Sequence, residues 1–270
     1  SDRGTATIPI ELDWGPDGEV FAVTNGEFQK DSLKIFGHAY TDEALCPMRE
    51  IFLHAQTVYF YRLNSGGEKA SNKFATAKYS GSRGNDLKIV IEENEAFTAD
   101  TNEIYDVSTY LDTSCVDIQK GVASMAELTE NDYVRFEAEA AIELTASTPL
   151  EGGTDGTTQD ANYQTYLDKI EPYTFNTMGC PSTDGIIQSL FVAFTKRLRD
   201  ESGVKFQTVL FQLLGDQVIL CNHELFFIRI RAKLNDLHAI QQRSGHGVQG
   251  VRRGNKQHVG QIKGDFQIMV

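Results

Sequence analysis

The chain has 270 residues, enough for two domains with hydrophobic cores of their own, and its 40% apolar and 23% charged residues are ordinary for a globular protein. No apolar run approaches the roughly 20 residues that a membrane-spanning helix requires, and no signal peptide is visible, so we expect no membrane insertion. The net charge of the chain is −13, and it is uneven: residues 216–270 carry +4, which leaves −17 for residues 1–215. Because such an acidic body repels phosphate backbones, we expect no nucleic acid as a partner.

The first predicted element is a strand in the segment IPIELDWGPDGEV, residues 8–20. Apolar and polar residues alternate in it, which predicts a half-buried strand with one apolar face made by Ile8, Ile10, Leu12 and Trp14. Pro9 cannot donate a hydrogen bond to a neighbouring strand. Pro9 therefore confines the strand to a sheet edge or to positions among its first residues, and we expect residues 5–14 to pair at or near an edge, where another copy of the chain could add a strand.

Residues 1–66 are predicted to form a segment of strands and a helix. A second short strand is expected at 19–24 and a third at 58–63. Between them, apolar residues at helical spacing predict a helix at about 42–55, with Pro47 in its first turn. The Asn-Ser-Gly-Gly sequence at 64–67 indicates a domain boundary.

Residues 67–153 consist of short segments rich in β-formers, separated by Gly, Asn, Asp and Ser. This spacing predicts an inserted β-domain, either an antiparallel sandwich or a barrel. Within it, Arg83-Gly84-Asn85-Asp86 is expected to form a hairpin loop between two strands, because Gly-Asn-Asp is typical of turns.

Residues 154–215 alternate between helix and strand. A helix capped by Asp160 leads to a strand at 173–180. A second helix, with Ser182, Thr183 or Asp184 as its N-cap and Gly203 at its end, leads to a strand at 205–214. This order predicts a parallel α/β sheet with right-handed crossovers.

Residues 216–270 differ from the rest of the chain, because eight Lys or Arg stand against four Asp or Glu. We expect this atypical basic segment to be able to contact an acidic neighbour, such as another copy. The four cysteines, Cys46, Cys115, Cys180 and Cys221, lie far apart without a Cys-x-x-Cys pair. They are expected to be free, buried thiols of a reducing compartment.

No constellation of reactive residues stands out. The GHGVQG segment at 245–250 has dinucleotide-type glycine spacing but lacks the flanking buried strand and helix. Ser124 lies in the β-rich region and is expected to be a loop residue or an N-cap. Cys221, His223 and His238 offer three metal ligands without a fourth at convincing spacing. We therefore assign no catalytic, cofactor-binding or metal residue, and expect no cofactor and no enzyme activity.

Several segments, in order, carry a family resemblance. ELDWGPDGEVFAVT, YSGSRGNDLKIVI, STPLEGGTDGT, YLDKIEPYTFN and LFVAFTKRLRDESGVKFQTVL resemble the contractile tail sheath proteins of long-tailed phages. The likeness extends to the sheaths of defective prophages and of phage-tail-like bacteriocins (tailocins), and it runs from about residue 4 to about residue 211. Several segments in the same order are far more specific than any single motif above.

The resemblance implies an α+β multidomain fold, in which a β-sandwich precedes a subtilisin-like α/β domain without catalytic residues. It also implies a structural virion protein that polymerises with itself around a tail tube, assembles in the bacterial cytoplasm, and contracts to drive the tube through a cell envelope. Baseplate and tail terminator proteins would be further partners. Terminal arms would add strands to the sheets of neighbouring subunits.

Two alternatives to the sheath prediction stay open from the residues alone. One is a subtilisin-like hydrolase, and the other is a module that binds glycans or cell surfaces. The sequence after Phe211 does not resemble the continuation of the family, and the start at Ser1 lacks the family's usual N-terminal segment. A truncated or frame-shifted copy is the expectation that follows from these two departures.

Overall fold

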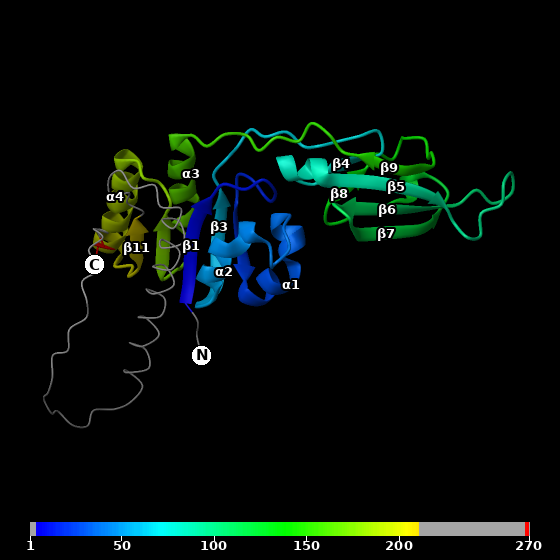
Figure 1. The fold of residues 1–270 in the computed structure, drawn as a ribbon. Coiled ribbons are helices and arrows are strands. Elements are labelled where there is room, and N and C mark those ends of the chain that lie inside the picture. Colours follow the sequence, from blue (N-terminus) through cyan, green and yellow to red (C-terminus); the bar gives the residue numbers. More distant parts are fainter. Residues whose placement is uncertain (1–3, 211–267, 270) are drawn as a thin grey trace, which may run out of the picture.

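The computed structural model describes residues 4–210 and 268–269, which form a mixed sheet with helices on both faces and a β-sandwich beside it (Figure 1). The four neighbouring strands β11, β10, β1 and β3 are parallel, whereas β2 and β12 run antiparallel to their neighbours. In spatial order the sheet contains β12 (Ile268–Met269), β11 (Gln207–Leu210), β10 (Thr177–Cys180), β1 (Gly4–Ile10), β3 (Ala55–Arg62) and β2 (Val20–Thr24).

The first strand is inside the sheet, so the prediction of a half-buried edge strand is wrong. β1 lies between β10 and β3, and its residues 6–9 are buried on both faces. Pro9 is tolerated because pairing with β10 ends at Thr7, while the β3 side continues to Ile10, whose oxygen accepts from Leu63 N–H at 2.8 Å. Alternate residues face opposite neighbours, so the missing N–H of Pro9 points past the last β10 pair.

Two pairs of helices cover the sheet. α1 (Asn25–Phe36) and α2 (Cys46–Phe52) pack on one face, where Phe28, Phe36 and Phe52 join β1 and β3 in a core. α3 (Asp160–Ile170) and α4 (Gly185–Ser202) cover the other face, with buried Tyr166 and Phe191. The predicted parallel α/β arrangement is therefore confirmed for these strands and helices.

Helix α1 was not predicted from the sequence. Thr24 and Glu27 form its capping box: Thr24 Oγ1 accepts from Glu27 N–H at 3.3 Å, and Glu27 Oε2 accepts from Thr24 N–H at 2.8 Å. This Thr-x-x-Glu spacing was visible in the sequence. It marks the start of a helix that lies between the strand predicted at 19–24 and the helix predicted at about 42–55.

The other helix predictions are confirmed in part. The helix expected at 42–55 is a 3₁₀ turn, η1 (Glu43–Leu45), followed by α2, with Pro47 in the first turn as predicted. Asp184 caps α4, and Gly203 ends it in the left-handed region at φ 64°. The N-cap of α3 is Gln159 rather than Asp160, because Gln159 and Asn162 bind each other's main chain.

The sandwich packs a two-stranded sheet against a four-stranded one. Side chains such as Phe74, Ile89, Val107 and Val134 form its core. The small sheet contains β4 (Ala75–Ala77) and β8 (Val134–Phe136), and the large one contains β7 (Ser114–Val122), β6 (Tyr105–Leu111), β5 (Leu87–Glu93) and β9 (Thr145–Pro149).

The structure also tests the predicted hairpin at Arg83, the predicted burial of the cysteines and the bounds of two strands. The hairpin expected around Arg83 is wrong, because residues 82–86 form the 3₁₀ helix η2 (Ser82–Asp86) and β4 and β5 pair with different strands. Cys180 is buried as predicted, whereas Cys115 is exposed and Cys46 is intermediate. The strands expected at 173–180 and 205–214 are shorter, as β10 and β11, and residues 211–214 lie outside the described part.

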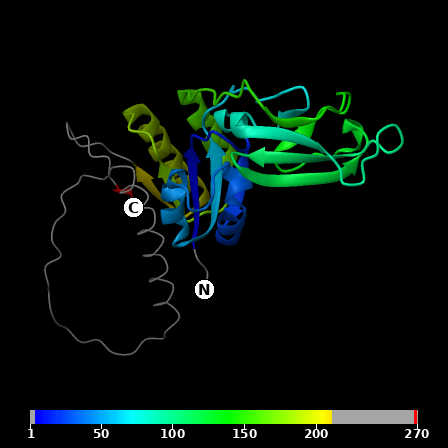
Figure 2. The ribbon, with the colours of Figure 1, turned by 45° about the vertical axis from the view of Figure 1, so that its right-hand side comes forward.

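Two connecting segments, one after β3 and one before α3, lead to the sandwich and back, and they lie side by side in both views (Figure 1, Figure 2). Isolated bridges join them at Ser65 with Thr157 and at Ser71 with Glu151. The sheet therefore takes strands from both ends of the described chain, and the sandwich is inserted between them.

Candidate functional site

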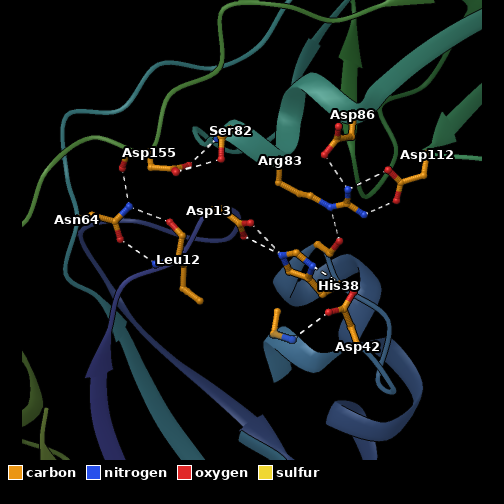
Figure 3. A network of polar contacts seen from close by, with 12 residues as sticks. Leu12, Asp13, His38, Asp42, Asn64, Ser82, Arg83, Asp86, Asp112 and Asp155 are labelled. Atoms are coloured by element: carbon orange, nitrogen blue, oxygen red, sulfur yellow. Dashed lines mark hydrogen bonds and ion pairs between the residues drawn. The ribbon is translucent and has the colours of Figure 1, made fainter. Parts of the chain in front are cut away.

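A network of polar contacts lies at the joint between the sheet and the sandwich (Figure 3). Side chains from the β1–β2 connection, the α1–η1 connection, η2 and the returning segment near residue 155 converge there (Figure 3). These segments are far apart in the sequence. Their contacts therefore determine how the sandwich is held against the sheet.

Arg83 is the central cation of the joint. Its Nε donates to Gly37 O at 2.7 Å, across the joint at the end of α1. Its other nitrogens donate to Asp86 Oδ2 at 2.7 Å and to Asp112 Oδ2 at 2.6 Å (Figure 3). The guanidinium lowers the pKa of Asp112 by hydrogen bonding. The side chain of Arg83 is only 13% exposed. One planar fork thus connects two carboxylates of the sandwich to the main chain of the sheet layer.

His38 lies next to this fork, directly after Gly37. Its Nε2 lies 2.9 Å from Asp13 Oδ2, and its Nδ1 lies 3.6 Å from Asp42 Oδ2. The hydrogen bond with Asp13 raises the pKa of His38, although burial and the nearby Arg83 oppose it. Both ring nitrogens therefore face carboxylates rather than a serine or cysteine side chain.

Arg62 and Asn64, at the end of β3, hold the connecting segments together. Arg62 is 1% exposed and donates to three main-chain oxygens, those of Gly15, Ser80 and Asp155, at 2.8 to 3.2 Å. Asn64 accepts from Leu12 N–H and donates to Leu12 O, both at 2.8 Å. Burial lowers the pKa of Arg62, and the nearby carboxylates oppose that change.

Trp14 is the apolar part of the joint. It follows β1 in the sequence but belongs to the core of the sandwich, where it packs edge-on against Tyr79 and stacks near Tyr133. Its Nε1 donates to Lys34 O of α1 at 3.0 Å. An aromatic ring from the sheet layer therefore fills the base of the sandwich, while its N–H remains bonded to the sheet layer.

The two layers approach so closely at Gly81 that no side chain fits. A Cβ there would lie 1.8 Å from Asp13 O, and φ is 139°. Arg83 N–H donates to the same Asp13 oxygen at 3.3 Å. Glycine at 81 is thus a condition for the observed contact between the β1–β2 connection and η2.

A cavity of about 580 Å³ opens beside the joint, above the carboxyl ends of β1 and β3. Ligands of α/β proteins often bind at such an edge. Here the polar lining groups already bind one another: Glu11 accepts from Thr158 Oγ1 at 2.6 Å, Asp13 faces His38, and Asn64 holds Leu12. These polar groups connect chain segments to one another, and none of the three contacts pairs a nucleophile with a base.

The residues considered for catalysis or metal binding do not come together in the described structure. Ser124 is the N-cap of the short 3₁₀ helix η3 (Met125–Glu127), in the sandwich. Cys221, His223, His238 and the 245–250 segment lie outside the described residues. No group of three or more metal-ligating side chains occurs among residues 4–210, and no helix there is long and apolar enough to cross a bilayer.

Three family models match the chain one after another. The Gp18 domain III N-terminal region of tail sheath proteins matches residues 3–63, the phage tail sheath β-sandwich domain matches 64–155, and the phage tail sheath central domain matches 156–219. All the segments that resemble tail sheath proteins therefore lie within these three tail sheath models.

Two Bacillus subtilis proteins are similar over most of the chain. The uncharacterized protein YqbK is 36% identical over 244 residues, covering 82% of this chain and 51% of its own. The phage-like element PBSX protein XkdK is 34% identical over 239 residues, and the match covers 80% of this chain and 50% of the relative. The chain therefore spans about half the length of the curated relatives it matches.

Solved structures agree with the sequence matches. A sheath tail protein of Desulfitobacterium hafniense superimposes with a TM-score of 0.73 at 33% identity, covering 86% of this chain and 59% of the other. The sheath tail protein Lin1278 of Listeria innocua superimposes with a TM-score of 0.70 at 30% identity, and the match covers 86% of this chain and 56% of the other.

The domain models and the solved neighbours support a structural protein of a phage tail. The ordered matches are more specific, and the chain belongs to the phage tail sheath protein family.

Proposed function

We propose that the protein polymerises with identical copies around a tail tube and contracts to drive that tube through a target envelope. Assembly would occur in the cytoplasm of the bacterial host, and the product would be part of the virion tail. The tube protein, the baseplate and the tail terminator are the proposed partners. Sheath family membership supports the structural role, and the outer edge of β2 supports self-assembly.

The observation that carries self-assembly is the outer edge of β2. This strand ends the sheet and pairs only with β3 in the part of the chain that the structure describes. A cavity of about 290 Å³ runs beside it, lined by Phe21, Ala22 and Val23 of β2, by α1 and by the sandwich. A backbone segment of a neighbouring copy could add to this edge and place side chains in the cavity.

The proposal includes no catalysis. A subtilisin-like architecture without its catalytic residues would explain an α/β sheet whose carboxyl edge carries structural contacts. In the described residues His38 is held by two carboxylates, and Ser124 lies in the sandwich. The hydrolase alternative would require a nucleophile in contact with a base, and hydrolytic activity of purified protein would support it instead.

Negative-stain microscopy and pelleting of the concentrated full chain test this proposal. Tubes, rings or striated sheaths support it. Ala22→Arg places a charged side chain at the exposed β2 edge and should reduce the pelleted fraction at least about tenfold, since added strands avoid charged edges. Ala99→Arg, at an exposed position in the β5–β6 loop, is the matched control and should pellet like the wild type. A wild-type chain that stays monomeric at high concentration would contradict the proposal.

A further inference from the structure

His38 lies where three segments of the joint meet. Asp13 approaches it from the β1–β2 connection, Asp42 from the start of η1, and Arg83 from η2 (Figure 3). The histidine side chain is 19% exposed, so water and protons reach it, while its two ring nitrogens remain directed at carboxylates. No other residue drawn in Figure 3 is a histidine.

The proton count of the ring determines how many of these contacts can form. A neutral imidazole carries one N–H, whereas the imidazolium carries two. Both Asp13 and Asp42 are acceptors when ionised, so only the imidazolium can donate to both at once. Loss of the proton leaves one ring nitrogen with its lone pair directed at a negative oxygen.

Arg83 donates to two main-chain oxygens, and both belong to residues next to His38 in the sequence or in the structure. The main-chain oxygen of Gly37, the preceding residue, accepts from Arg83 Nε at 2.7 Å. The main-chain oxygen of Asp13, whose carboxylate holds the ring, accepts from Arg83 N–H at 3.3 Å. A change in the His38–Asp13 contact therefore acts on both main-chain contacts that Arg83 makes with the sheet layer.

We propose that His38 is a proton-operated latch of the joint between sheet and sandwich. In the imidazolium form the latch ties the α1–η1 connection to the β1–β2 connection and fixes the position of Arg83. In the neutral form the connections separate from each other, and the sandwich gains freedom relative to the sheet. This inference does not depend on polymerisation, because all its contacts lie within one copy.

The surrounding charges determine the direction of the effect. Asp13 and Asp42 favour the protonated ring and Arg83 opposes it, but Arg83 is itself paired with Asp86 and Asp112. The pKa of His38 is raised, with the Asp13 hydrogen bond as the largest cause. Since the folded value exceeds the ordinary 6.5 or so, the latch is fully closed below about pH 6.5 and opens as the pH rises through the raised pKa.

The single tryptophan of the chain reports on this joint. Trp14 directly follows Asp13, and its ring lies in the base of the sandwich. We expect the fluorescence of the full-length protein to change with pH, with a midpoint above about 6.5. His38→Gln should abolish this transition, and Asp13→Asn should lower its midpoint, because the hydrogen bond with Asp13 is the largest cause of the raised pKa of His38. His54→Gln is the control. His54 directly precedes β3, at the end of the strand away from Arg62 and the joint, so the fluorescence of this variant should change with pH like that of the wild type.

A transition that persists in His38→Gln, or a flat wild-type profile between pH 5 and 9, would overturn the latch. A variant that fails to fold does not remove the test, because NMR titration of the His38 ring in the wild-type protein follows the proton directly. Coincident midpoints for the His38 resonance and Trp14 emission support the proposal. Midpoints that differ by more than about one pH unit refute it.

Discussion

Arg83 and Gly37 join the sandwich to the sheet through a hydrogen bond of 2.7 Å from Nε to a main-chain oxygen. Gly37 ends α1 in the left-handed region at φ 73°, and a Cβ there would lie 2.8 Å from Arg83 Cγ. The aliphatic stem of Arg83 therefore packs directly on the backbone turn. Because Asp112 binds two of its nitrogens, the fork cannot rotate without losing bonds on the sandwich side.

Replacing Arg83 by alanine should loosen the joint and lower the free energy of unfolding by about 2 kcal/mol. The substitution leaves Gly37 O without its donor and Asp112 without its cation, although water replaces part of the loss at Asp112, which is 53% exposed. Urea denaturation followed by Trp14 fluorescence measures the change.

The exposed Arg197–Glu171 pair provides the control for Arg83. Arg197 also donates two bonds to one carboxylate, but its side chain is 42% exposed and it joins two helices of one layer. Arg197→Ala should leave the unfolding midpoint almost unchanged, because exposed pairs contribute little. Equal losses for both variants would contradict a special role for Arg83.

Elements with local determinants were predictable from the sequence. Asp184 and Gly203 mark the ends of α4 by capping chemistry, and Pro47 marks the first turn of α2. Such features act within a few residues, so the sequence pattern is sufficient. The capping box of α1 belongs to the same class and could have been predicted.

The joint could not be predicted in this way. Arg62 binds the main-chain oxygen of Asp155, 93 positions away, and any residue type supplies such an oxygen. The place of β1 depends on where its pairing with β10 stops, which the isolated Pro9 does not reveal. Trp14 continues an apolar alternation in the sequence, but in the structure the chain leaves the strand at Ile10 and the ring enters another core.

Arg62→Met should lower the free energy of unfolding by about 3 kcal/mol, since it removes the donor to three main-chain oxygens at once, two of them in buried contacts. Arg62→Lys keeps the charge but cannot span all three acceptors, so an intermediate loss is expected. Urea titration gives both values. Arg135→Met, at an exposed position of β8, is the matched control and should change stability by less than about 0.5 kcal/mol.

Gly81→Ala should disrupt the contact between η2 and the β1–β2 connection. The new Cβ would overlap Asp13 O, and the φ of 139° is unfavourable for alanine. Calorimetry should show a lower unfolding temperature, with faster hydrogen exchange at the Arg83 amide. Gly26→Ala, in α1 with no atom near the new Cβ, should instead raise stability by about 0.5 kcal/mol. A neutral Gly81→Ala would show that the close approach is not required.

The three described cysteines should react with thiol reagents in the order of their exposure. Cys115 is exposed on β7, Cys46 is intermediate, and Cys180 is fully buried in β10, where burial raises the pKa of its thiol to about 12. Since the thiolate is the reactive form, native protein at pH 8 should be labelled first at Cys115, while Cys180 should react only when the sheet unfolds. Peptide mass spectrometry over time distinguishes the sites. Labelling of Cys180 in native protein as fast as that of Cys115 would mean that the α3 and α4 layer does not cover β10 in solution.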